Sequence, residues 1–277
     1  MFSVILPFHM DIALLERSLA SVAGQTLWPD EIIVIDNSPE HLLADYQAPC
    51  SPALTAKLSI IPVARKQHAA LARNVGIKKA KAGNHIAFLD SGDVWHAQHL
   101  SQAQDYFAAH AGHKKVVYYA SYLNFDMNKS QYWLRQSQPV DVENDLLKFC
   151  TIGTSSVIVA GLQPYKFPPF KRRHDLALWV TLKRAGFLFV HNPNCNVLRV
   201  IEKGSLSSPF FRKLYAQVLI YRYLKSANVF LIAKFLMFQA LAKASFVGKK
   251  KSSIDDIQTT FGFSTISAAP QKQDVAP

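Results

Sequence analysis

The sequence predicts an α/β domain built on a doubly wound, mainly parallel sheet with helices on both faces, followed by a basic helical C-terminal extension. Strand and helix patterns alternate through the first half of the chain, which is the order that βαβ units produce. Apolar residues make up 49% of the 277 residues and charged residues 18%, which excludes a disordered chain. Three predicted strands end in polar residues, as expected of a ligand cleft at the carboxyl ends of a sheet.

The first half supplies five strands and three helices in alternation. Short apolar runs predict strands at Phe2–Pro7, Glu31–Asp36, Leu58–Val63, His85–Leu89 and Val116–Ala120. Apolar residues at helical spacing predict helices at Asp11–Gln25, Ala69–Ala82 and Ala97–Ala109. The second of these helices is closed by Gly83.

The middle of the chain is less regular. Its patterns predict a helix at Val140–Phe149, a strand at Ser155–Ala160 and a loop around Pro164, Pro168 and Pro169. A helix follows at Asp175–Ala185, where Leu178, Trp179 and Leu182 share one face and Gly186 ends the pattern. Two more strands are expected, at Phe187–His191 and Val197–Ile201.

The formal charge of +12 is concentrated in one part of the chain. Residues 160–251 hold 17 Lys and Arg but only two acids, whereas the first 159 residues are nearly balanced. Such asymmetry suits a polyanion, either an anionic lipid or a phosphorylated substrate, although a basic surface also aids solubility. Nucleic acid is excluded as a partner because the chain has no zinc-ligand spacing, RNA-binding aromatic signature or recognition helix.

These patterns divide the chain into three parts. Residues 1–208 form the α/β domain, residues 209–251 form the basic, aromatic helical extension, and residues 252–277 are predicted to be disordered. The extension has no apolar window of about 18 residues, so a membrane span is not expected. Two alternatives remain for it: a helix at the membrane interface, with 249–251 reaching acidic headgroups, or a helix packed onto the domain.

The cysteines and the N-terminus bear on the compartment. Cys50, Cys150 and Cys195 are odd in number and lack metal-ligand or redox spacing, which favours a reducing environment. The first seven residues are typical of a strand and not of a signal peptide. We therefore expect a cytoplasmic protein.

The most informative stretch is 84–95, where an apolar run from Ile86 to Leu89 delivers Asp90 and Asp93 to the end of a strand. Carboxylates at that position are costly to bury unless a cation or hydrogen-bond donors meet them. The alternative is an Asp-Ser-Gly-Asp turn whose carboxylates are solvated at the rim.

Seven segments, in order over about residues 2–208, together resemble family 2 inverting glycosyltransferases of the GT-A fold, of the bacterial surface-polysaccharide type. They are the opening strand 4–8, the helix and turn 18–26, the strand and its acidic end 31–38, the Ala-Arg-Asn helix start 72–77, the Asp-x-Asp-like segment 88–95, the segment 174–179, and Arg199 with Gly-Ser-Leu-Ser at 204–207. The C-terminal 70 residues lie outside this resemblance.

The resemblance implies a donor site for a nucleotide sugar. Its donor-binding residues would be Pro7, Phe8, Asp36, Asn37, Arg73, Asp90 and Arg199. Family members commonly carry two acids where this chain has Asp36 and Asn37, so either residue is a candidate for reading the base. A simple turn at 36–39 and a surface ion pair at Arg73 are the structural alternatives.

The resemblance also implies a divalent metal, Mn²⁺ or Mg²⁺, but the chain departs from the family at that point. Gly92 stands where the family places its main metal ligand. One hypothesis is that Asp93 replaces that ligand and binds the ion with Asp90, since a metal on a diphosphate needs only one or two protein carboxylates. The rival hypothesis is that basic side chains stabilise the leaving group, with Lys171, Arg172 and Arg173 as candidates.

Asp175 corresponds to the general base of the family, and His174 replaces the usual Glu before it. The alternative role for Asp175 is a helix cap, which an Asp fills well. The expected function is transfer of a sugar from a nucleotide-sugar donor, a UDP-sugar above others, to a glycan or lipid-linked acceptor in surface polysaccharide or lipopolysaccharide synthesis. The protein would then work at the inner face of the plasma membrane. A non-catalytic nucleotide-sugar or glycan-binding relative is the alternative function.

Overall fold

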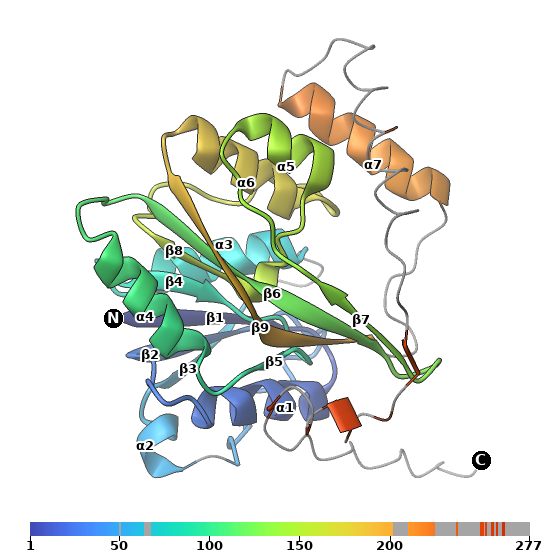
Figure 1. Cartoon of the computed structure of the whole chain (residues 1–277). Coiled ribbons are helices and arrows are strands. Elements are labelled where there is room, and N and C mark those ends of the chain that lie inside the picture. The colour runs from blue at the N-terminus through green and yellow to red at the C-terminus, as the bar shows by residue number, and fades with distance from the viewer. Residues whose placement is uncertain are drawn as a thin grey trace.

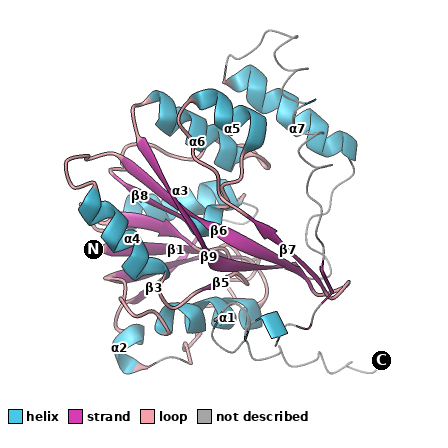
Figure 2. Cartoon of the chain, in the orientation of Figure 1, coloured by secondary structure: helices cyan, strands magenta, loops and turns pink. Residues whose placement is uncertain are grey.

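The computed structural model describes residues 1–49, 51–63, 68–201 and 210–224, and a few residues beyond: Met237, Lys250–Lys251, Ser253, Asp256–Ile257, Thr259 and Gly262–Phe263. Within these residues the chain forms one mixed sheet with helices on both faces (Figures 1 and 2). The predicted α/β class is confirmed. The predicted Gly-Ser-Leu-Ser segment at 204–207 lies outside the described residues.

The first half of the chain forms the parallel part of the sheet. Its strands lie side by side in the order β3-β2-β1-β4, and they span Phe2–Phe8 (β1), Glu31–Asp36 (β2), Leu58–Pro62 (β3) and His85–Phe88 (β4). The helices of this half are α1 (Ile12–Ala23), α2 (Pro52–Thr55), α3 (Ala69–Lys79) and α4 (His99–Ala109). All the predicted elements of this half are present, and α2 is an addition that the sequence pattern did not indicate.

The second half adds mostly antiparallel pairs. Its strands are β5 (Val94–Trp95), β6 (Val116–Asp126), β7 (Gln131–Arg135), β8 (Val157–Ala160), β9 (Leu188–Ile201) and β10 (Lys250–Lys251). Strand β8 joins the two halves because it pairs antiparallel with both β4 and β6. The helical elements are α5 (Glu143–Phe149), η1 (Thr154–Ser156), α6 (His174–Arg184) and α7 (Phe210–Tyr223).

The two strands predicted at 187–191 and 197–201 are one continuous strand, β9, so that prediction was wrong. The polar stretch between them is typical of a turn, but β9 continues through it with register shifts against β6. The Asn192 side chain is buried, and its amide donates to the Tyr118 hydroxyl over 2.9 Å. A polar residue thus stays inside the sheet because a buried partner satisfies it.

Two apolar clusters fill the two faces of the sheet. Helices α3, α5, α6 and α7 pack on one face, and α1, α2 and α4 on the other (Figure 1). Helix α3 approaches β1 closely at Gly76, because a Cβ there would lie 2.5 Å from a methyl carbon of Ile5. This close packing sets the distance between the sheet and helix α3, which carries Arg73.

The predicted C-terminal extension begins with helix α7. Ile220 and Tyr221 are buried in the cluster that contains α5 and α6, and the Tyr221 hydroxyl donates to the Leu147 carbonyl over 2.8 Å. One face of α7 is therefore packed on the domain. Most of the rest of the extension lies outside the described residues, and no described helix is long and apolar enough to span a bilayer.

In the segment 252–277, for which the sequence predicts disorder, two of the described residues are buried. Ile257 and Phe263 pack against an apolar cluster on β5, β6 and β9 that includes Val94 and Leu198. Most of this segment lies outside the described residues.

Candidate functional site

The carboxyl ends of the parallel strands place the predicted acidic residues at one edge of the sheet. In β1 and β2, Phe8 pairs with Asp36, and in β1 and β4, Ile5 pairs with Phe88. Asp90 follows β4 by two residues, so Asp36 and Asp90 lie on the same edge and are separated by β1. Neighbouring strands lie about 4.8 Å apart, which puts both ends within the length of one nucleotide.

Residues Asp90–Asp93 form a tight turn, here named the acidic turn. The Asp93 N–H donates to the Asp90 carbonyl over 3.0 Å, and Gly92 has φ of +96°, a conformation that favours glycine. Ser18 of α1 fastens this turn, since its Oγ accepts from the Gly92 N–H and donates to the Asp93 carbonyl, both over 2.9 Å. These four residues thus form the turn that one alternative predicted. The turn is also anchored to helix α1 through Ser18.

Asp90 is held by Arg73 of α3, which in turn contacts His174 of α6. The Arg73 guanidinium, only 4% exposed on α3, forms an ion pair with the Asp90 carboxylate, and Arg73 Nη1 lies 2.9 Å from His174 Nε2 at the start of α6. Burial would raise the pKa of Asp90, but the charge and hydrogen bond of Arg73 hold that pKa below its ordinary value. Asp90 is therefore an anion at neutral pH.

His174 is the neutral member of this chain of contacts. Its Nδ1 lies 3.1 Å from the Phe170 carbonyl, so this nitrogen carries the proton while Nε2 accepts from Arg73. Burial lowers the pKa of His174, and the nearby Arg73 charge lowers it further against the opposing effect of Asp175. A neutral imidazole here accepts the guanidinium N–H without adding a second positive charge.

Asp93 has different partners from Asp90. The Ser155 hydroxyl donates to its carboxylate over 2.5 Å, and Arg199 Nε lies 3.7 Å from the same oxygen. The antiparallel register of β5 and β9 pairs Val94 with Leu198, which brings the adjacent Asp93 and Arg199 opposite each other. Burial raises the pKa of Asp93 to about 6, and the Asp90 charge adds to the rise while Arg199 opposes it.

Asp175 lies in the first turn of α6, directly after His174. Its Oδ1 accepts from the Leu176 N–H over 2.9 Å, and its side chain is partly exposed. The N-cap position of α6 belongs to Arg173, which adopts a left-handed conformation with φ of +57° and has no side-chain capping bond. Asp175 is therefore not the N-cap, and the contact of His174 with Arg73 links its segment to the acidic turn.

The residues predicted to hold the nucleoside lie at the ends of β1 and β2. Both Asp36 carboxylate oxygens accept bonds from its own loop, from the Ser38 N–H and hydroxyl at 2.9 and 2.6 Å and from the Leu43 N–H at 3.2 Å. The Asn37 N–H donates to the Phe8 carbonyl over 3.0 Å. The Phe8 ring is in the core, so a contact of Phe8 with a nucleoside would involve its backbone, whereas Pro7 is partly exposed.

A divalent ion was predicted on Asp90 and Asp93, and three features of the described residues weigh against these two carboxylates as its ligands. Among the described residues no cluster of three or more His, Cys, Asp or Glu is arranged to hold a metal. Each of the two carboxylates already has an arginine partner. The intervening position is a glycine, which offers no side-chain oxygen.

Three residues of the site were not predicted as site residues: Ser18, Ser155 and Arg17. Their roles depend on interactions with Asp93, which lies more than 60 positions away in the sequence. Trp95 is fully buried and donates from its indole to the Ser155 carbonyl over 2.7 Å. Lys66, a further basic residue near Arg73 in sequence, lies outside the described residues.

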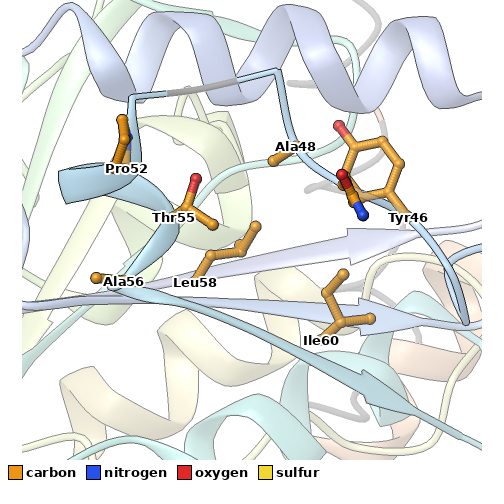
Figure 3. A pocket seen from close by; sticks show the side chains of 8 residues that line it. Tyr46, Ala48, Pro52, Thr55, Ala56, Leu58 and Ile60 are labelled. Atoms are coloured by element: carbon orange, nitrogen blue, oxygen red, sulfur yellow. The ribbon is translucent and has the colours of Figure 1, made fainter.

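A cavity of about 770 Å³ lies at the β3 edge of the sheet (Figure 3). Its walls come from the loop after β2, from α2 and from β3, and none of the predicted site residues lines it: Tyr46, Gln47, Ala48, Pro52, Thr55, Ala56, Leu58 and Ile60. This cavity is separate from the acidic turn.

Comparisons with known proteins agree with this geometry. The sequence profile described as "Glycosyl transferase family 2" matches residues 3–173, more than half of the chain. The chain is 28% identical over 204 residues to the UDP-Glc:α-D-GlcNAc-diphosphoundecaprenol β-1,3-glucosyltransferase WfaP of Escherichia coli, covering 72% of this chain and 77% of WfaP. It is 30% identical over 190 residues to the succinoglycan biosynthesis protein ExoW of Rhizobium meliloti, covering 63% of this chain and 59% of ExoW.

A solved structure extends the likeness to the fold. The mannosyltransferase PcManGT from Pyrobaculum calidifontis, in complex with GDP-Man and Mn²⁺, superposes with a TM-score of 0.57 at 15% identity, covering 94% of this chain and 78% of PcManGT. The predicted GT-A fold is thereby confirmed for the described part of the chain.

Proposed function

Because this chain belongs to glycosyl transferase family 2, we propose that it transfers a sugar from a UDP-sugar to a glycan or lipid-linked acceptor with inversion of configuration. The glycosyltransferase class follows from the family, whereas the donor and acceptor are our inference. The name of WfaP, which pairs a UDP-sugar with a diphosphoundecaprenol acceptor, supports these substrate classes. The name of ExoW supports a role in the synthesis of a bacterial surface polysaccharide.

One observation carries the proposal: the contacts that connect Asp90, Arg73 and His174 to the start of α6. Asp90 would face the donor, and Asp175 follows His174 directly in the chain. An inverting transfer needs these two groups near one reacting carbon, one beside the donor sugar and one beside the acceptor hydroxyl. The contact of Arg73 with both Asp90 and His174 supports such an arrangement.

In the proposed reaction Asp175 removes the proton of the acceptor hydroxyl. The freed oxygen attacks the anomeric carbon from the face opposite the diphosphate, a new carbon–oxygen bond forms, and the bond from that carbon to the diphosphate oxygen breaks. The electron pair of that bond leaves with the diphosphate, so the site must neutralise negative charge there. A general base of this kind contributes on the order of 10²–10⁴ in rate.

We assign the nucleoside to the ends of β1 and β2. There the Asn37 side chain or the Asp36 carboxylate would hydrogen-bond the base edge, and partly exposed Pro7 would contact the ring. Asp36 already accepts three bonds from its own loop, so its part would be to fix that loop while retaining acceptor capacity for the base.

The test begins with donor binding. Purified protein is titrated calorimetrically with UDP-, GDP-, dTDP- and CMP-sugars, each with EDTA and with Mn²⁺. A UDP-sugar is expected to bind more tightly than the other three classes. At a free concentration of 100 times its dissociation constant, it should raise the free energy of unfolding by about 2.7 kcal/mol. Binding of none of the four classes would contradict the proposal. Binding without turnover on any glycan or lipid-linked acceptor would favour a non-catalytic relative.

We also propose that α7 meets an anionic membrane surface that carries the acceptor. Its packed face holds Ile220 and Tyr221, whereas Tyr215, Leu219 and Tyr223 are exposed at a spacing of four residues. Aromatic residues on one helix face beside basic residues are typical of interfacial helices. In flotation with phosphatidylglycerol vesicles, the wild type should rise with the vesicles. A Tyr215→Ser, Tyr223→Ser double variant should stay at the bottom of the gradient. Equal flotation of the two proteins would contradict this assignment.

A further inference from the structure

Three guanidinium groups from three separate elements surround the acidic turn. Arg73 of α3 pairs with Asp90, and Arg199 of β9 lies 3.7 Å from Asp93. Arg17 of α1 is the third, since it is close enough to Asp93 to favour that carboxylate's ionised form. Three cations therefore face two carboxylates, and the cluster has a surplus of positive charge before any ligand binds.

The position of Arg17 is related to the glycine of the turn. With φ of +96°, residue 92 faces α1, and a Cβ placed there would lie 3.5 Å from Arg17 Nη2 and 3.6 Å from Leu14. A longer acidic side chain at this position would reach the guanidinium. A carboxylate side chain at position 92 would therefore lie next to the Arg17 guanidinium.

The three arginines differ in what they can reach. Arg73 is 4% exposed and is held by Asp90 and His174, so it keeps the acidic turn in place. The Arg199 side chain is 40% exposed and lies over the Tyr122 ring at 5.3 Å, which leaves part of its guanidinium accessible. Arg17 is partly exposed. Arg17 and Arg199 are therefore the more exposed of the three arginines.

We propose that Arg17 and Arg199 neutralise the diphosphate of the donor in the role usually given to a divalent ion, so that the nucleoside diphosphate binds this chain without metal. This inference rests on the proposed function. Guanidinium groups suit the task because they donate paired hydrogen bonds to phosphate oxygens. A divalent cation placed among three guanidinium groups would meet like-charge repulsion in a partly buried site.

The experiment compares UDP with uridine, which lacks the diphosphate, by calorimetric titration in EDTA and in Mn²⁺. The wild type should bind UDP with the same affinity under both conditions. Arg17→Ala should weaken UDP binding in EDTA by about tenfold or more, the loss expected for one charge-assisted hydrogen bond, and should leave uridine binding unchanged. Lys129→Ala, which removes an exposed charge from the turn between β6 and β7, is the control and should bind like the wild type.

Several results would overturn the inference. UDP binding that needs Mn²⁺ would return the role to a metal and would leave the proposed function standing. Equal UDP affinity of Arg17→Ala and Lys129→Ala would remove Arg17 from the site. Failure of both uridine and UDP to bind the wild type would overturn the inference together with the proposed donor site. If Arg17→Ala unfolds on thermal melting, Arg17→Gln replaces it, and the metal comparison on the wild type needs no variant.

Discussion

Asp36 and Asp90 lie on the same edge of the sheet, yet they are held in opposite ways. The partners of Asp36 are two and seven residues away in its own loop. The partner of Asp90 is Arg73 on another element, which in turn meets His174, 101 positions from Arg73. The first carboxylate stabilises a local loop, whereas the second joins separate elements. The acidic turn, and not the β2 end, is therefore the part of this sheet edge that is coupled to α6.

The largest expected effect distinguishes the kinetic role of Asp175, next to His174, from that of Asp36. Asp175→Asn should lower kcat by on the order of 10²–10⁴ and leave the donor KM close to the wild-type value, because the base acts only on the acceptor proton. Asp36→Asn should instead raise the donor KM with a small change in kcat. Steady-state assays of UDP release measure both. If Asp175→Asn turned over at a rate near that of the wild type, the role of the base would be lost.

The next effect concerns stability. Arg73→Ala should lower the free energy of unfolding by about 2–3 kcal/mol, since Asp90 and His174 both lose a charged partner. Ser38→Ala removes one donor to Asp36 while the Ser38 N–H remains, and should cost about 1 kcal/mol. Urea denaturation of both variants gives the two values. Equal losses would show that the contacts across elements are no stronger than the local ones.

A smaller effect is expected at Gly92. Its φ of +96° is strained for any residue with a Cβ, so Gly92→Ala should cost about 1–2 kcal/mol of stability. The exposed Gly112, where an added Cβ meets nothing within 4 Å and no positive φ is imposed, provides the matched control. Thermal melting of Gly92→Ala and Gly112→Ala should therefore differ, and identical melting temperatures would contradict the strained turn.

The smallest effect is a pH dependence at His174. The pKa of His174 is lowered in the folded state, so its contribution to stability is complete above the ordinary imidazole range and is lost as the pH falls through that range. His174→Gln keeps an acceptor for Arg73 but cannot titrate. Between pH 7 and pH 5 the wild type should lose more stability than this variant in urea titrations. Parallel pH profiles would show that His174 does not titrate on unfolding.

The sequence predicted the strands of the parallel half well because each contains a short apolar run. The four-residue α2 and the two-residue β5 are too short to show a period, and β9 was divided because its polar centre is satisfied by Tyr118 from another strand. In the site, Asp90, Arg73, Asp93 and Arg199 were named from motifs and do lie together. Arg17, Ser18 and Ser155 were missed because their partner Asp93 lies more than 60 positions away, and no local pattern reports such a contact.

The central claim is that Asp175 and the acidic turn carry out an inverting transfer. The most direct measurement incubates the protein with the α-configured UDP-sugar that it binds and with a glycan or lipid-linked acceptor, and assigns the anomeric configuration of the first product by proton NMR. We expect a β-linked product with the wild type and, with Asp175→Asn, donor binding by calorimetry but almost no product. An α-linked product, or a β-linked product formed at an undiminished rate by Asp175→Asn, would contradict this claim.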